Sequence, residues 1–143
     1  MWFEITSEKL TAEALIQRVR RDDSGAVLVF LGVVRNHNLG RGVDFLEYDA
    51  YPQMAEKVMR EIAEDAQQRW DINDIAIQHR TGRLEIGETS LLVAVASTHR
   101  REGFEAGQWI VDRFKEIVPI WKKEIWEGGE EWIEGELAPK QAG

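Results

Sequence analysis

The chain has 143 residues, of which 43% are hydrophobic and 31% are charged, a balance typical of a globular domain with its own core. The net charge of −8 argues against generic nucleic-acid binding, and the absence of cysteine excludes disulfides, thiolate metal sites and a cysteine nucleophile. No stretch approaches the roughly 18 consecutive apolar residues of a membrane span and no signal-peptide pattern opens the chain, so we expect a cytoplasmic protein.

The first half of the chain predicts two helices set between runs that favour β-structure. The expected elements are a strand at 2–5, a helix over 11–21, a turn at 22–25, a buried strand over 25–34, a polar loop over 35–42 and a returning strand over 43–51. Pro52 then opens a helix over 53–69. Met54, Val58 and Ile62 recur every four residues in this helix, which predicts an apolar face.

The second half predicts more strands and a third helix. The expected elements are a strand over 75–80, a connection with two glycines over 82–88, an apolar strand over 89–98, a helix over 102–118 and a hairpin about Gly128-Gly129. Pro119 ends the third helix, because it cannot extend the helix smoothly. No repeat or linker divides the chain, so we expect residues 1–143 to form one domain. Interspersed helices and strands with two apparent hairpins favour an α+β fold, with mixed or antiparallel strands and about three helices.

Lys115 holds an unusual place on the predicted third helix. At about 100° per residue, Phe104, Val111 and Val118 fall on one apolar stripe, and Lys115 lies on its margin instead of on the acidic face. The pattern alone favours a lysine whose stem packs against the core while its amine reaches water. The alternative is a lysine that lines a cleft, where its amine has a chemical role.

Positive charge gathers where predicted elements end. The residues concerned are Arg35, His99, Arg100, Lys122 and Lys123. If these ends meet in the fold, they form a cluster suited to a phosphate group. If they do not meet, each is a solvated end of its own element.

The histidines do not indicate a metal site. They lie far apart in the sequence, at positions 37, 79 and 99, and no cysteine accompanies them. His79 falls in an alternating strand, which favours a hydrogen-bonded structural residue. We therefore expect neither a metal nor a cofactor.

Four segments, taken together, carry a resemblance to a known family. They read GAVLVFLGVVRNHNLG, LEYDAYPQMAEKVM, IAIQHRTGRLEIGE and AVASTHRREGFEAGQWIVDRFKEIVPIWKKE. Their order and spacing resemble the large, catalytic subunit of molybdopterin synthase, the MoaE family, over roughly residues 25–134. Each motif alone is weak, whereas the ordered set is specific.

The resemblance implies a sulfurtransferase of molybdenum-cofactor biosynthesis with an α/β hammerhead fold. The substrate of such an enzyme is cyclic pyranopterin monophosphate, which becomes the dithiolene of molybdopterin. The donor is the C-terminal Gly-Gly thiocarboxylate of a small ubiquitin-like subunit, and a central homodimer of large subunits completes a heterotetramer. Because the partner brings the sulfur, a chain without cysteine is compatible with this chemistry.

The same resemblance assigns roles to individual residues. Lys115 and Lys122 are expected to be catalytic, with Lys115 nearest the thiocarboxylate and Lys122 on the substrate and its anionic intermediate. The expected substrate-binding residues are Val33, Val34, Arg35, His99, Arg100, Lys115, Lys122, Lys123 and Glu124. Since family dimers build the pocket across the subunit interface, some of these residues are expected to serve the partner's site.

One position departs from the family pattern. Some members carry an arginine where this chain has Glu136, so Arg101 or Lys140 is expected to replace that contact, unless the contact is dispensable. Two other functions remain open from the sequence. One is a non-catalytic module that binds an anion or nucleic acid, and the other is a scaffold that docks a ubiquitin-like tail.

Overall fold

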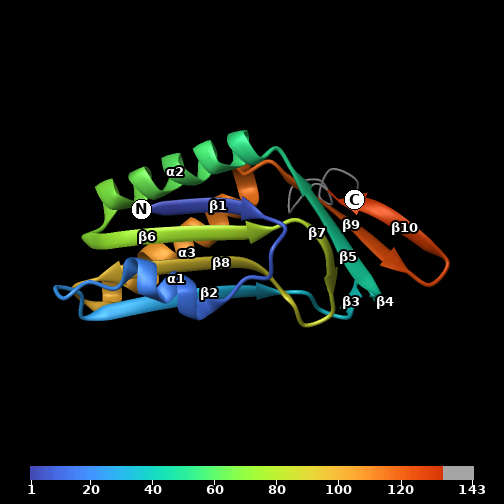
Figure 1. Ribbon diagram of the computed structural model, residues 1–143, viewed down its shortest axis with the longest axis horizontal. Helices are drawn as coiled ribbons and strands as arrows, with labels where there is room; N and C mark the ends of the chain where they lie inside the picture. The colour runs from blue at the N-terminus through green and yellow to red at the C-terminus, as the bar shows by residue number, and fades with distance from the viewer. Residues whose placement is uncertain (134–143) are drawn as a thin grey trace.

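The computed structural model describes residues 1–133, which form helices on a four-stranded sheet and a second four-stranded sheet at one end of it (Figure 1). The helices are α1 (Ala12–Val19), α2 (Pro52–Arg69) and α3 (Arg100–Ile117). The strands are β1 (Trp2–Thr6), β2 (Ala26–Val33), β3 (His37–Asn38), β4 (Arg41–Gly42), β5 (Phe45–Ala50), β6 (Ile72–Arg80), β7 (Gly82–Glu85), β8 (Thr89–Ser97), β9 (Ile120–Trp126) and β10 (Gly129–Ile133). The expected α+β architecture with mixed and antiparallel strands is confirmed.

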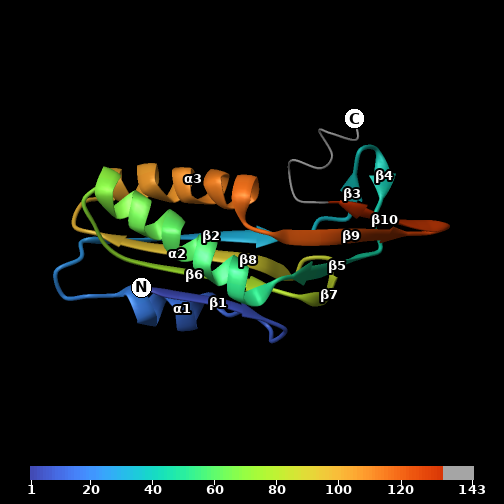
Figure 2. The ribbon, with the colours of Figure 1, turned by 90° about the horizontal axis from the view of Figure 1, so that it is seen from above.

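The first sheet has the strand order β1-β6-β8-β2 and carries the main core. β1 runs parallel to β6, whereas β6 and β2 are both antiparallel to β8. α1 covers one face and α3 the other, as Figure 2 shows, and α2 packs beside α3. Because helices cover both faces, β8 is apolar on both sides, with Val93 and Val95 toward α2 and α3, and Leu92 and Ala94 toward α1.

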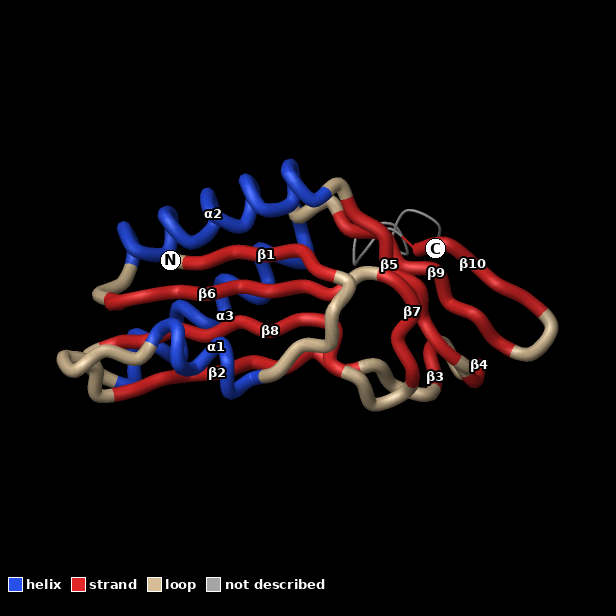
Figure 3. Tube along the Cα trace, in the orientation of Figure 1, coloured by secondary structure: helices blue, strands red, loops and turns tan. Residues whose placement is uncertain are grey.

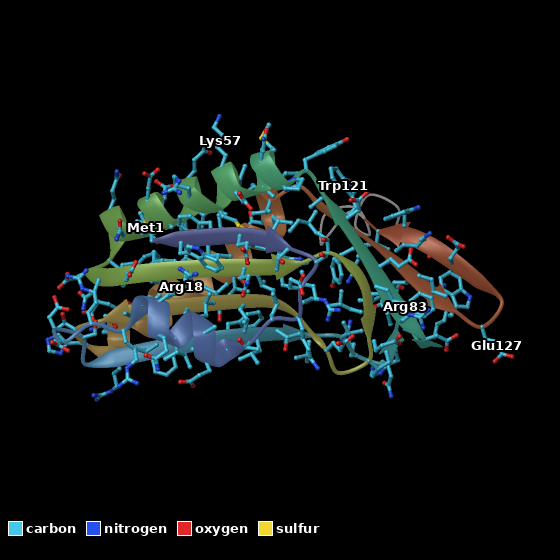
Figure 4. The ribbon with its side chains drawn as sticks, viewed as in Figure 1. Met1, Arg18, Lys57, Arg83, Trp121 and Glu127 are labelled. Carbon is cyan, nitrogen blue, oxygen red and sulfur yellow. The ribbon has the colours of Figure 1, made fainter. Side chains whose placement is uncertain are left out.

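The second sheet has the order β10-β9-β5-β7, and all its neighbouring strands are antiparallel. The chain passes between the two sheets several times, including from β6 into β7, from β7 into β8 and from α3 into β9, so the two sheets meet at these junctions (Figure 3). Its own apolar cluster is small and consists of Val34, Val43, Leu46 and Leu84. Trp121 lies near the start of α2 (Figure 4) and packs edge-on against Tyr51 at 5.0 Å between ring centroids.

The end of α3 sets the direction of the chain at the junction of the sheets. The backbone turns extended at Val118, and Pro119, which has no N–H to donate, prevents another helical turn. β9 then begins at Ile120. This turn puts Lys115 in the last turn of α3 and Lys122 in the adjoining strand.

The structure corrects two predicted apolar stripes. Phe104 is 63% exposed, because α3 approaches the sheet through small residues such as Gly103 and Ala106 instead. A Cβ on Gly103 would lie 2.9 Å from Ser97 Oγ, so this close approach leaves no room for a larger residue. On α2, Met54 is also exposed, since the buried face begins at Ala55.

Three predicted segments differ from the structure. The run at 25–34 was expected to be a buried strand, but β2 lies at the edge of its sheet, and its apolar residues from Phe30 onward are partly exposed. The polar loop at 35–42 contains the β3–β4 hairpin. The connection at 82–88 contains β7, which pairs with β5. Within residues 1–133, no helix is long and apolar enough to cross a membrane.

Candidate functional site

A cavity lies where the second sheet meets the first, and we call it the basic cavity. Its deeper part is lined by residues of both sheets and of α3, and its outer part by the segment after β2 and by the β3–β4 hairpin. The lining residues used below are Gly32, Val33, Val34, Arg35, Asn38, Tyr48, His79, Ser90, Phe114, Lys115, Lys122 and Glu124. Both parts share Lys115, Lys122, Tyr48 and Ser90, so they form one continuous site.

Lys115 and Lys122 reach this cavity from different elements. Lys115 lies in the last turn of α3, and Lys122 is in β9 directly opposite Tyr48 of β5. Lys115 directly follows the buried Phe114 in α3, and it lines the cavity although the residue is exposed in the single chain. Of the two interpretations of Lys115, the geometry therefore favours a lysine in a cleft.

His79 forms part of the cavity floor and is only 4% exposed. Its Nδ1 lies 2.7 Å from the Arg80 carbonyl oxygen, which can only accept, so Nδ1 carries the proton. The ring stacks on Phe114 at 5.8 Å and meets Tyr48 edge-on at 4.8 Å. Burial, and to a smaller degree the charge of Lys115, lower the pKa of His79 from 6.5 to about 4, although the bond to Arg80 opposes the shift. His79 is thus a neutral, rigid wall near neutral pH.

The segment Val33–Arg35 enters the cavity through an irregularity in the sheet. The register between β2 and β8 shifts between Gly32 and Val33, so Ser90 has no partner in register on β2. The Ser90 hydroxyl instead donates to the Gly32 carbonyl at 3.2 Å. Such bulges redirect a strand, and this one turns the chain so that Arg35 lines the cavity beside the lysines.

Glu124 is buried in the cavity wall and binds the β3–β4 hairpin. It is 2% exposed, and its carboxylate accepts hydrogen bonds from Asn38 Nδ2 at 2.7 Å and from Arg41 Nη2 at 3.4 Å. The Arg41 guanidinium also lies 3.6 Å from the centre of the Trp126 ring and 3.1 Å from Glu131. Glu124 therefore holds the hairpin to β9, in addition to any contact it makes with a ligand.

Three of the predicted substrate-binding residues lie away from this cavity within one chain. The Lys123 ammonium pairs with Glu130 at 2.9 Å and Glu47 at 3.4 Å, and the hydrogen bond to Glu130 is the main cause that raises its pKa. His99 and Arg100 stand at the opposite end of α3, about 22 Å from Lys115 at 1.5 Å per residue. The roles expected for these residues stay predictions. Glu136 and Lys140 lie outside the described residues.

Several cavity residues carried no signal in the sequence. Tyr48, Ser90 and Asn38 reach the site only through strand register, the bulge and the hairpin. His79 was interpreted as a hydrogen-bonded structural residue, which is confirmed, but its place in the cavity depends on the packing of β6 against α3.

The arrangement is suited to an anionic organic ligand. One guanidinium and two ammonium groups line the cavity, accompanied by the hydroxyls of Tyr48 and Ser90. Within residues 1–133, no group of three or more histidines, aspartates and glutamates is placed to hold a metal ion.

Comparison with known proteins agrees with this geometry. A family model described as MoaE protein matches residues 5–117, most of the chain. The chain belongs to the MoaE family. A relative from Pyrococcus abyssi, named molybdopterin synthase catalytic subunit, is 48% identical over 129 residues, which cover 90% of this chain and 87% of the relative.

Solved structures of MoaE relatives have the same fold. Molybdopterin synthase from Staphylococcus aureus superposes with a TM-score of 0.87 at 41% identity, covering 91% of this chain and 95% of the other. A Helicobacter pylori structure, described as a complex of subunits 1 and 2 of molybdopterin-converting factor, superposes with a TM-score of 0.75 at 21% identity, covering 91% and 88% of the two chains. The second likeness shows the fold alone.

Proposed function

We propose that this MoaE-family chain is the catalytic subunit of a molybdopterin synthase. It transfers sulfur from the C-terminal thiocarboxylate of a small ubiquitin-like subunit to cyclic pyranopterin monophosphate, which makes it a sulfurtransferase. The observation that carries this proposal is the convergence of Lys115, Lys122 and Arg35 from three elements on one cavity. The names of its relatives support the same activity.

Both lysines line the two parts of the cavity, and we assign a different role to each. Lys115 lies in the last turn of α3, and its ammonium stabilises the negative charge that develops when the thiocarboxylate reacts, or transfers a proton. Lys122 lies beside Tyr48 and holds the substrate and its anionic intermediate. Arg35, at the outer part, binds the phosphate, for which a planar guanidinium is well suited.

The exposed edge of β2 supports a homodimer. β2 is an edge strand, and Phe30, Leu31 and Val33 are 38%, 46% and 56% exposed. Phe104, beside it on α3, contributes to an apolar groove between the helix and the strand. An exposed apolar edge strand is a template for pairing with another chain, and a second copy of this chain is the occupant we propose.

A twofold pairing of β2 strands would also complete the site. Ala26 pairs with Ser97, so the end of β2 near residue 26 lies beside His99 and Arg100, whereas the other end carries Arg35. If β2 pairs antiparallel with β2 of a second copy, the Ala26 end of one strand lies beside the Val33 end of the other. His99 and Arg100 would then serve the partner's cavity, within a heterotetramer with one small subunit at each end.

The partner subunit is the small ubiquitin-like sulfur carrier. The Helicobacter pylori relative is described as a complex of two subunits, which supports an assembly of this kind. The carrier's C-terminal Gly-Gly thiocarboxylate would enter the cavity toward Lys115. A glycine tail suits a narrow channel because it carries no side chains.

Reconstitution with thiocarboxylated small subunit and cyclic pyranopterin monophosphate tests the activity. We expect wild-type protein to form molybdopterin, and Lys115→Ala to lose at least about a hundredfold in rate, the size of effect of one electrostatic catalytic group. Arg113→Ala, which removes an exposed cation of the same helix paired with Glu116, is the control and should retain the wild-type rate. A Lys115→Ala protein with the wild-type rate would contradict the assignment.

Mixing two defective variants tests the shared site. In the proposed dimer each cavity takes Lys115 from one subunit and Arg100 from the other. When Lys115→Ala and Arg100→Ala proteins are mixed 1:1 and exchange subunits, about half of the dimers are mixed, and one of the two cavities in each mixed dimer has both wild-type residues. About a quarter of all sites should therefore regain activity. Mixtures with no activity beyond the sum of the two variants would argue that each chain builds its cavity alone.

A further inference from the structure

Residues 79–88, with the sequence HRTGRLEIGE, lead along the chain from β6 to β8. They begin at the floor of the basic cavity and are hydrogen-bonded to Val34, the residue before Arg35. The segment begins at His79 in the cavity floor, passes through β7 and ends at Glu88, just before β8. None of the roles proposed above uses its charged residues. Two of them, Arg80 and Glu88, are largely buried and lie against each other.

The Glu88 carboxylate is held from two sides. Its Oε2 accepts a hydrogen bond from Arg80 Nη1 at 3.0 Å, and its Oε1 accepts one from the backbone N–H of Glu85 at 2.8 Å. The side chains of Arg80 and Glu88 are only 16% and 24% exposed. The Glu85 N–H, and then Arg80, keep the pKa of Glu88 below its ordinary value, so the carboxylate is charged at neutral pH.

The backbone next to this carboxylate clamps the residue before Arg35. The Val34 N–H donates to the Glu88 carbonyl at 2.9 Å, and the Gly87 N–H donates to the Val34 carbonyl at 2.7 Å. Gly87 has a φ of +87°, a conformation that glycine adopts without strain. Both polar groups of Val34 are thus bound to the backbone of residues 87 and 88, so a shift of the backbone at Glu88 would move Val34.

Arg35 itself has weaker support. Its side chain is exposed, and its hydrogen bond to Asn38 Oδ1 is long, at 3.3 Å. The bulge at Ser90 sets the direction of the chain only as far as Gly32 and Val33. The backbone on either side of Arg35 is held by the clamp on Val34 and by one hydrogen bond from the Val43 N–H to the Asn36 carbonyl at 2.9 Å.

We propose that Glu88, held by Arg80, is a positioning residue that keeps the Val33–Arg35 segment in the conformation that binds the phosphate of the substrate. This inference rests on the proposed function of the cavity, since it assigns the phosphate to Arg35. Glu88 acts through Val34 and does not touch the ligand. A preorganised segment binds more tightly because binding need not order it.

Glu88→Gln tests the role, with Glu85→Gln as the matched control. Glu88→Gln removes the charge that pairs with Arg80 but keeps the shape of the side chain. Glu85 lies in the same segment, and its side chain pairs with Arg83 at 2.8 Å, but both side chains are more than half exposed. In the reconstituted complex we expect Glu88→Gln to raise KM for cyclic pyranopterin monophosphate roughly tenfold, the worth of one charge-assisted hydrogen bond, while kcat stays within about twofold. Glu85→Gln should leave both constants unchanged.

Amide hydrogen exchange gives a second readout that does not depend on turnover. In Glu88→Gln the Val34 and Gly87 amides should exchange roughly tenfold faster, while amides in the middle of β8 keep their wild-type protection. Arg80→Met should have the same effect, and combining it with Glu88→Gln should add little, because both act through one contact.

The outcomes separate this inference from the proposed function. A raised KM without faster Val34 exchange would overturn the inference, since Glu88 would then act on the ligand directly. Equal effects of Glu88→Gln and Glu85→Gln, or no effect of either, would overturn it as well. If wild-type protein does not convert the pterin but the amide exchange rates still differ between the variants, the proposed synthase activity is contradicted. The proposed effect of Glu88 on the position of Val34 is then still supported.

Discussion

The two four-stranded sheets of this protein are stabilised in different ways. In the first sheet, β8 is buried continuously from Ser90 to Ser97, and helices cover both its faces. In the second sheet, Glu124 is the one fully buried residue of β9, and cations lie over aromatic rings or between carboxylates. Arg41 on Trp126 and Arg83 on Phe45, each at 3.6 Å, are examples. Hydrophobic burial dominates the first sheet, whereas the second combines a small apolar cluster around Leu46 and Leu84 with contacts of cations to aromatic rings and carboxylates.

The basic cavity takes one kind of wall from each sheet. Its floor, with His79 and Phe114, belongs to the first sheet and α3, whose packing is dense and depends little on salt. Its rim, with Lys122 and Glu124, belongs to the second sheet. A rigid apolar floor and a charged rim together favour a ligand with an apolar ring and an anionic group. Four predictions test this contrast, in order of decreasing effect.

The largest effect is expected in the first sheet. Leu92 in β8 is fully buried between α1 and the strands, so Leu92→Ala should lower the free energy of unfolding by about 2 to 5 kcal/mol. Urea unfolding measures this loss, and it should not vary with salt. A loss below about 1 kcal/mol would mean that the first sheet relaxes easily and is not the rigid frame described here.

The second effect concerns the protonation of His79. Its pKa is about 4 in the folded protein and 6.5 in an unfolded chain, so between these values only the unfolded state binds the proton. Stability should therefore fall as the pH drops from 7 to 4, by about 3 kcal/mol from this residue alone. Over the same pH range, the free energy of unfolding of His79→Phe should fall by about 3 kcal/mol less than that of the wild type, because the variant lacks this titrating group. Equal pH dependence of the two proteins in urea unfolding would contradict a buried neutral His79.

The third effect concerns the buried carboxylate of the second sheet. Glu124→Gln removes the charge that Asn38 and Arg41 bind, and it should cost about 1.5 to 3 kcal/mol of unfolding free energy, as for hydrogen bonds to charged groups. The β3–β4 hairpin should then become susceptible to limited proteolysis near Leu39. Unchanged proteolysis would show that other contacts hold the hairpin.

The smallest effect is expected at Lys123. Its pairs with Glu47 and Glu130 lie on the surface of the second sheet, where ion pairs contribute little. Lys123→Met should shift the unfolding midpoint slightly in low salt, and the difference should vanish near 1 M salt, where the Debye length is about 3 Å. A large shift that persists in high salt would mean that charge is not what Lys123 contributes.

Much of the fold followed from local patterns in the sequence. The helices of the chain begin and end within a few residues of their predicted bounds, and Pro119 ends α3 as expected. The errors lie where a partner strand decides the structure. β7 and the β3–β4 hairpin are too short to carry a pattern of their own, and the exposure of Phe104 depends on how closely α3 approaches β8.

The candidate site was predictable to a similar extent. Charges at element ends pointed to Arg35 and Lys122, and helical spacing set Lys115 apart from the acidic face of its helix. Tyr48 and Ser90 could not be found in this way, because each enters the cavity through a register between strands distant in sequence. His99 and Arg100, which the pattern grouped with the others, lie at the far end of α3.

The sequence by itself determined the helices, the stop at Pro119 and the family motifs. These depend on interactions among near neighbours in the chain, which periodicity and proline chemistry report directly. Only the tertiary structure decided that Lys115 and Lys122 face one cavity, that His79 lies beneath them uncharged, and that Glu88 holds the segment before Arg35. These features depend on strand pairing and on burial, which bring together residues that no local pattern connects.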